Sequence, residues 1–287
     1  MSAPPFIKLI ECPRDAMQGF ARTIPTAEKV AYLRSLLSVG FDTLDLGSFV
    51  SPKAIPQMAD TADVLRQLPL QESRSKQLVI VANERGAREA LSYATIHYLG
   101  FPFSVSETFQ QRNTSAGREE AASLVATIQD LCGASHHQLV VYLSMAFGNP
   151  YGDPYHQEEV LEWADRLVPL GISVFSLADT VGMASPDRVY ELTTAFRKAF
   201  PQVETGLHLH ANPLGWKEKV EAGLQAGCTR FDAALGGVGG CPMAADSLVS
   251  NLNMEQLVEW LTDKGHSTGI DAAQLKISSA MAKQLFS

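Results

Sequence analysis

The chain has 287 residues, of which 46% are hydrophobic and 19% charged, and it carries a formal net charge of −8 with a pI near 5.4. This composition supplies ample material for a core and shows no sign of disorder. The acidic balance, without any block of Lys or Arg, argues against nucleic-acid binding, and no apolar run is long enough to span a bilayer. We therefore expect a soluble protein with no nucleic-acid or membrane partner.

The cysteines are few and widely spaced, and they indicate a reducing environment. The four are Cys12, Cys132, Cys228 and Cys241, with no CxxC pair and no disulfide-rich spacing. The first residues lack the charged and long apolar regions of a secretory signal. We expect a cytoplasmic location.

Short β-rich segments alternate with longer helical segments along the chain. The predicted strands are residues 6–12, 42–48, 77–83, 95–105, 138–146, 172–178, 205–211 and 229–235. Helical patterns include residues 26–40, 117–133 and 185–200, and the tail 270–287 adds a further helix. We expect Thr26 to cap the first of these helices and Gly40 to end it, and Ser185 with Pro186 to begin the third.

Eight strand–helix units predict an α/β fold, and in this length they close naturally into a (β/α)8 TIM barrel. A doubly wound open sheet is the competing architecture. We expect a single catalytic domain over residues 1–287, with the barrel at about residues 6–265 and a C-terminal helical extension at about residues 266–287.

Polar residues follow the predicted strands at the point where each strand ends. They are Glu11, Arg14, Asp15, Gln18, Asp45, Asn83, Ser106, Glu107, Asn113, Tyr142, Ser144 and Asp179. Because the active site of a barrel lies at the carboxyl ends of its strands, these side chains should meet around one mouth. Among them we expect Gln18, Asn113, Tyr142 and Ser144 to contact the substrate.

The stretch GLHLHANPLG (206–215) places two histidines two residues apart in a predicted strand. Residues at that spacing project to one face, so His208 and His210 could bind a single divalent cation, with Asp15 as a carboxylate ligand. Mixed oxygen and imidazole ligands suit Mg²⁺ or Mn²⁺, and also other divalent metals. The alternatives are a polar pair at a strand end and, for Asp15 beside Arg14, a surface ion pair.

The glycine-rich stretch GGVGGCPMA (236–244) follows the last predicted strand and contains Cys241. Its spacing matches neither a Walker motif nor a dinucleotide fingerprint. Such a loop can approach a ligand closely, which favours a cysteine that reaches the substrate over a buried inert thiol. Asp179 lies at a strand end, where a helix cap or turn role is the alternative.

Together, the motifs PRDAMQ, SFVSPKAIPQM, SETFQQRN, SLADTVG, HLH and GGVGGCPMA resemble those of the 3-hydroxy-3-methylglutaryl-CoA (HMG-CoA) lyases, a family of metal-dependent TIM-barrel enzymes. The resemblance runs in order from about residue 6 to residue 270. It implies the metal ligands Asp15, His208, His210 and Asn251. It also implies catalytic roles for Arg14, Cys241 and Asp179, and for Asp45 at a position where the family usually has glutamate.

The resemblance implies a reaction in which HMG-CoA is split into acetoacetate and acetyl-CoA, with a divalent metal cation (Mg²⁺ or Mn²⁺) as cofactor and a homodimer as the assembly. Arg14 would stabilise the developing negative charge, and Cys241 would protonate the enolate carbon or relay that proton. The base could be Asp179, or His210 when displaced from its ligand role. The alternatives are a lyase for another 3-hydroxyacyl-CoA, a related Claisen-type acyltransferase such as an isopropylmalate or citramalate synthase, and an inactive barrel used for binding.

Overall fold

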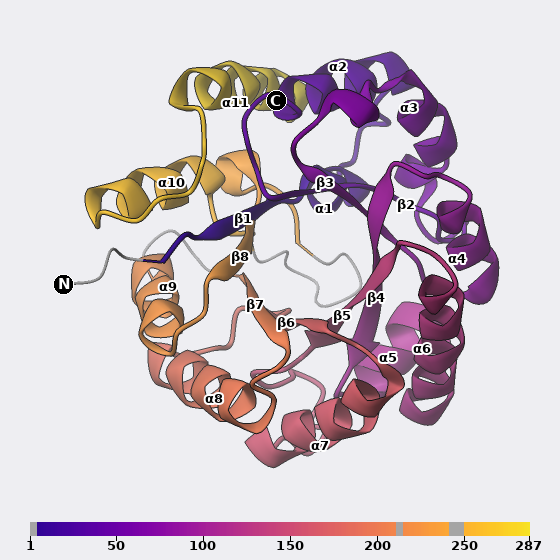
Figure 1. Ribbon diagram of the computed structural model, residues 1–287, viewed down its shortest axis with the longest axis vertical. Helices are drawn as coiled ribbons and strands as arrows, with labels where there is room; N and C mark the ends of the chain where they lie inside the picture. Colours follow the sequence, from indigo (N-terminus) through magenta and orange to yellow (C-terminus); the bar gives the residue numbers. More distant parts are fainter. Residues whose placement is uncertain (1–4, 211–214, 241–249) are drawn as a thin grey trace.

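In the computed structural model, which describes residues 5–210, 215–240 and 250–287, eight parallel strands close into a barrel (Figure 1). Each strand pairs with the next, and β1 (Lys8–Glu11) closes the ring with β8 (Arg230–Ala233). The other strands are β2 (Thr43–Ser48), β3 (Lys76–Ile80), β4 (Ile96–Ser104), β5 (Gln138–Ser144), β6 (Val174–Asp179) and β7 (Glu204–Leu209). The predicted TIM barrel is confirmed, and the open sheet is wrong.

Helices surround the barrel (Figure 1). They are α1 (Pro13–Gln18), α2 (Thr26–Leu36), α3 (Thr61–Gln67), α4 (Glu84–Leu91), α5 (Glu107–Thr114), α6 (Arg118–Gly133), α7 (Gln157–Leu167), α8 (Pro186–Ala199), α9 (Trp216–Gln225), α10 (Met254–Asp263) and α11 (Ala272–Leu285). Within the described ranges, no helix is both long and apolar enough to cross a membrane.

Each predicted strand overlaps an observed one, and the differences lie at the ends of elements. Asn83 does not end β3, which stops at Ile80; its side chain instead accepts a hydrogen bond from the Gly86 N–H and caps α4. Thr26 is the first residue of α2 rather than its cap, because its hydroxyl donates to Asp60. Ser185 caps α8 as predicted, by accepting from the Arg188 N–H.

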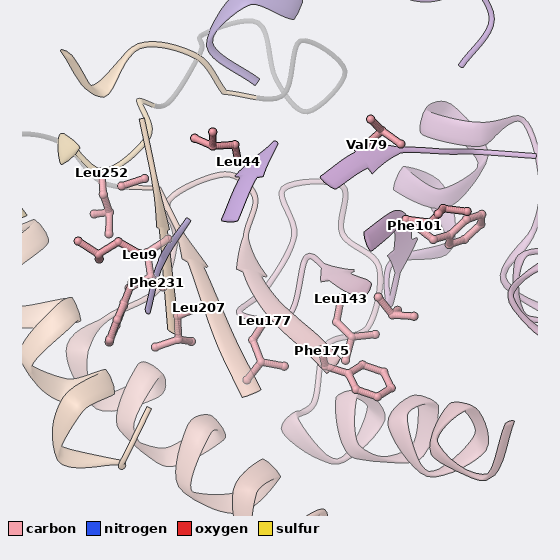
Figure 2. Packing of buried hydrophobic residues seen from close by; sticks show 14 of the residues in the cluster. Leu9, Leu44, Val79, Phe101, Leu143, Phe175, Leu177, Leu207, Phe231 and Leu252 are labelled. Carbon is pink, nitrogen blue, oxygen red and sulfur yellow. The ribbon is translucent and has the colours of Figure 1, made fainter. Parts of the chain in front are cut away.

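The main core lies between the strands and the helices, as Figure 2 shows. Side chains on the outer face of the barrel, such as Phe175 and Leu207, are fully buried there. The ring of Phe175 packs 5.6 Å from that of Phe196 in α8. Gly223 in α9 allows this helix to approach closely, since a Cβ there would lie 2.5 Å from Leu207 Cδ1. Alternation along β7 therefore turns Leu207 outward and leaves His208 facing inward.

A second, smaller cluster fills the inside of the barrel. It consists of Leu78, Ile80, Tyr98, Val140, Tyr142 and Val174. Gly100 of β4 makes room for it, because a Cβ at this position would lie 2.6 Å from Ile80 Cδ1 and 3.1 Å from the Tyr142 ring. The interior is thus a packed plug below the mouth of the barrel rather than a pore.

The C-terminal helix α11 lies beyond the last barrel unit, as predicted for the tail, and Asp271 caps its first turn. It packs beside α2 (Figure 1). The ring of Phe286 lies 5.9 Å from Tyr32 and 5.6 Å from Phe20. These contacts attach the extension to the side of the barrel, away from the inward-facing histidines.

Candidate metal centre and substrate cavity

A cavity of about 360 Å³ opens at the carboxyl ends of the strands. Eight of the residues predicted to bind the metal, contact the substrate or act in catalysis line it, namely Arg14, Asp15, Gln18, Asn113, Tyr142, Ser144, His208 and His210. They come from α1, α5, β5 and the end of β7, so segments distant in sequence converge here as the barrel rule requires. This volume suits a small acyl group.

The two histidines point to the same place. His208 lies in β7, His210 directly follows the strand, and their Nε2 atoms are 3.2 Å apart. Ligand atoms of Asp15, His208 and His210 all lie within 4.8 Å of one another. One ion could contact all three, since imidazole and carboxylate ligands bind divalent metals at roughly 2.0–2.2 Å.

The Nδ1 atom of each imidazole lies against an oxygen that can only accept a hydrogen bond. His208 Nδ1 lies 3.2 Å from Asp232 Oδ2, and His210 Nδ1 lies 2.9 Å from the carbonyl oxygen of Thr180. Both Nδ1 atoms must therefore donate, which leaves a lone pair on each Nε2 of the neutral rings. Two lone pairs this close repel unless a proton or a metal cation lies between them. The donor set thus fits a divalent cation.

The surroundings of the two imidazoles shift their pKa values in opposite directions. Burial lowers the pKa of His208, but the hydrogen bond and charge of Asp232, with the charge of Asp15, outweigh it and raise this pKa above its usual value. Burial and the neighbouring His208 lower the pKa of His210 to about 4. For Asp15, burial is outweighed by the charges of Arg14 and the histidines, so its pKa is lowered and it stays ionised.

Asn251 reaches the site through Asp15. Its Nδ2 donates to Asp15 Oδ2 at 2.7 Å and to the Val238 carbonyl at 3.0 Å. Gly239 packs against the same pair, because a Cβ at this position, whose φ is +106°, would lie 2.7 Å from Asn251 Nδ2 and 2.9 Å from the Asp15 carbonyl oxygen. In this arrangement the Asn251 amide orients Asp15. Metal binding by Asn251 Oδ1 stays a prediction.

The guanidinium of Arg14 donates hydrogen bonds to three side chains. Its Nε and Nη2 donate to Asp45 Oδ2 at 2.9 and 2.5 Å, and its Nη1 donates to Asp15 Oδ1 at 3.1 Å and Gln18 Oε1 at 2.9 Å. Asp45 is fully buried behind Arg14 and does not line the cavity. Burial raises the pKa of Asp45 to about 6, while Arg14 opposes the shift. In this arrangement the Asp45 carboxylate holds the guanidinium of Arg14, and a catalytic role of its own stays a prediction.

Asp179 is also placed differently from the expectation. Its Oδ2 accepts from Lys219 Nζ at 2.7 Å and its Oδ1 accepts from the Ala184 N–H at 3.0 Å. The residue is 1% exposed and does not line the cavity, although its neighbours Ala178 and Thr180 do. In this arrangement the Asp179 carboxylate binds Lys219 and a main-chain N–H instead of facing the cavity, and its role as the base stays a prediction.

Three residues that orient the histidines were not predicted: Asp232, Thr180 and Lys219. Asp232 lies on the inner face of β8, and its only sequence signal is a carboxylate inside the predicted strand TRFDAAL. Cys12 joins Asp232 and His208 in a second group of possible metal ligands within 4.8 Å, with its thiol buried below the cavity. Thr180 acts through its backbone, which no residue type reveals. Cys241 lies outside the described residues.

The chain matches the HMGL-like family model over residues 7–281. It is 30% identical to the hydroxymethylglutaryl-CoA lyase YngG of Bacillus subtilis, covering 92% of this chain and 87% of the relative. It is 32% identical to the (R)-citramalyl-CoA lyase of Chloroflexus aurantiacus, covering 93% of this chain and 86% of that relative. The structure of an HMG-CoA lyase from Acinetobacter baumannii, in complex with coenzyme A and 3-methylmalate, has a TM-score of 0.90 at 30% identity and covers 98% of this chain and 91% of that chain. On this evidence the chain belongs to the HMGL-like family of carbon–carbon lyases.

Proposed function

We propose that this protein is a hydroxymethylglutaryl-CoA lyase that uses a divalent cation to split HMG-CoA into acetoacetate and acetyl-CoA. The observation that carries the proposal is the pair of imidazole Nε2 atoms, 3.2 Å apart beside Asp15 at the floor of the cavity. The family membership supports the lyase chemistry, and the relatives named for hydroxymethylglutaryl-CoA support this substrate.

Asp15, His208 and His210 would hold the metal, with Asn251 as a further proposed ligand. When bound, a divalent cation supplies a Lewis acid that polarises substrate oxygens and orients the bond to be broken. Mg²⁺ and Mn²⁺ suit the mixed oxygen and nitrogen donors, and Asp15 contributes the hard carboxylate.

The reaction requires a base, an anion-stabilising group and an acid. Removal of the 3-hydroxyl proton forms the carbonyl of acetoacetate, the C2–C3 bond breaks, and its electron pair passes to the thioester as an enolate. Of the two bases proposed from the sequence, His210 lines the cavity and Asp179 does not. His210 would serve as the base only when displaced from the metal, because its Nδ1 donates to the Thr180 carbonyl oxygen and only its Nε2 has a lone pair. Arg14 lines the cavity as a permanent cation held by Asp45 and is suited to bind the developing negative charge.

The enolate carbon then takes a proton to give acetyl-CoA, and we assign this step to Cys241. The assignment rests on the family resemblance, because Cys241 lies outside the described residues. Gln18, Asn113, Tyr142 and Ser144 line the cavity and are proposed to contact the acyl group. The coenzyme A complex of the Acinetobacter baumannii relative supports an acyl-CoA as the substrate.

A second candidate substrate is citramalyl-CoA, another 3-hydroxyacyl thioester. The Chloroflexus aurantiacus relative named for it is 32% identical to this chain, which is as similar as the hydroxymethylglutaryl-CoA lyase of Bacillus subtilis at 30%. The same cation, base and arginine would serve either reaction, so the groups that line the cavity must decide between the two substrates.

The test is cleavage of both thioesters by the purified protein with Mg²⁺ or Mn²⁺, followed by mass spectrometry of the products. We expect acetyl-CoA and acetoacetate from HMG-CoA, loss of activity after chelation, and recovery on adding back the metal. The control is His208→Ala, which removes one metal ligand and should be inactive. Faster cleavage of citramalyl-CoA would favour the second candidate, and cleavage of neither would contradict the proposed function.

A further inference from the structure

The helix α9 carries a buried ammonium group that points away from solvent toward the end of β7. Lys219 is 7% exposed, in contrast to its exposed neighbour Lys217 two residues earlier. Figure 1 shows α9 outside β7 and β8. From this helix, the side chain of Lys219 reaches the carbonyl oxygen of His210 at the end of β7. Burial of an ammonium is costly unless it is paired and hydrogen-bonded, so the contacts of Lys219 indicate what it holds in place.

Three acceptors surround the Lys219 ammonium, and all belong to segments next to the metal centre. Lys219 Nζ donates to Asp179 Oδ2 at 2.7 Å, to the carbonyl oxygen of His210 at 2.9 Å and to that of Gly182 at 3.3 Å. An ammonium has three protons, and each has an acceptor here. One side chain therefore joins α9, the end of β6, the turn after it and the residue that follows β7.

The same turn also sets the ring of His210. His210 Nδ1 contacts the carbonyl oxygen of Thr180, which lies between Asp179 and Gly182 in this turn. Lys219 thus holds the main chain of His210 directly. It also binds Asp179 and Gly182, which lie on either side of Thr180, the residue that orients the His210 imidazole. Loss of the ammonium would free both restraints at once and would also leave the Asp179 carboxylate buried without its cation.

We propose that Lys219 is a positioning residue that fixes both the backbone and the ring of His210 for metal binding, with Asp179 as the partner that holds the ammonium in place. The inference rests on the metal centre of the proposed function, and it gives Asp179 a positioning role. Lys219 itself does not line the cavity, so it acts through His210 and not on the substrate.

Groups that orient metal-binding histidines typically contribute roughly 10–100-fold to metal affinity. We therefore expect Lys219→Met, which keeps an unbranched side chain one atom shorter and removes its charge, to weaken Mn²⁺ binding by a factor in this range. Lys217→Met is the matched control, because it makes the same change on the same helix at an exposed position, and its affinity should equal that of the wild type.

The experiment is titration of the full-length protein with Mn²⁺ alone, with free Mn²⁺ followed by electron paramagnetic resonance and folding checked by circular dichroism. Because Lys219→Met leaves a buried carboxylate, the double variant Asp179→Asn with Lys219→Met provides a second test. Removing both charges should restore stability without restoring the hydrogen bond to His210. We expect this double variant to fold as the wild type does and still bind Mn²⁺ weakly.

Wild-type affinity in folded Lys219→Met or in the folded double variant would overturn the inference and leave the proposed metal centre standing. Equal weakening in Lys217→Met would also overturn it, because the effect would then follow the charge of the helix. A wild-type protein that binds no Mn²⁺ would overturn the proposed function, and the inference with it.

Discussion

Replacement of Asp232 should weaken metal binding, although this residue does not line the cavity. The perturbation acts through His208, whose Nδ1 lies 3.2 Å from Asp232 Oδ2. A hydrogen bond to a charged group contributes about 1.5–3 kcal/mol, and each 1.4 kcal/mol corresponds to about tenfold in affinity. Asp232→Ala removes this acceptor, so we expect Mn²⁺ affinity to fall by up to about 100-fold.

Asp232→Asn separates the hydrogen bond from the charge. The amide oxygen can still accept from His208, but a neutral hydrogen bond is about half as strong as a charge-assisted one. We therefore expect an affinity loss of about tenfold, between wild type and Asp232→Ala. The assay is Mn²⁺ titration by electron paramagnetic resonance, and the control is Asp130→Ala, which removes an exposed carboxylate from α6. Wild-type affinity in folded Asp232→Ala would refute the argument.

Three further changes test other parts of the structure. Arg14→Lys keeps the charge but loses the planar guanidinium that binds Asp45, Asp15 and Gln18. Turnover should therefore fall by orders of magnitude while Mn²⁺ still binds. Unchanged turnover would remove Arg14 from the mechanism. Burial raises the pKa of Glu11 well above 4.5, so its contribution to stability is fully present below that value and is lost as the pH rises through the folded-state pKa. In urea unfolding, the stability of Glu11→Gln relative to wild type should therefore increase as the pH rises above 4.5, and parallel pH profiles would contradict this. Gly100→Ala would place a Cβ 2.6 Å from Ile80 Cδ1, and we expect a loss of about 1–3 kcal/mol in the free energy of unfolding; an unchanged thermal midpoint would show that the interior has room.

Much of the fold could be predicted because the barrel repeats one simple pattern. Each predicted strand window contains most of an observed strand, since buried parallel strands are short apolar runs flanked by helices. The errors lie where a side chain had two possible partners. Thr26 could cap α2 but instead donates to Asp60, and a sequence does not show that Asp60 lies nearby.

The cavity residues were predictable because the barrel rule collects polar groups at the strand ends. The supporting groups were less visible. Asp179 and Asp45 have the residue type and position of catalytic carboxylates, yet neither lines the cavity, because Asp179 binds Lys219 and Asp45 binds the guanidinium of Arg14 from behind. Only the packing of α9 against β7 brings Lys219 to Asp179, and such contacts between distant segments leave no periodic signal in the sequence.

The position of the metal tests the account most directly, because the proposed chemistry depends on His208, His210 and Asp15 holding one cation. The measurement is anomalous X-ray diffraction from crystals of the wild-type protein grown with Mn²⁺. If these three residues hold one cation, we expect a single strong peak at the floor of the cavity, roughly 2.0–2.6 Å from both Nε2 atoms and from an Asp15 oxygen. A peak bound by other residues, or a cavity floor without one at saturating Mn²⁺, would contradict it.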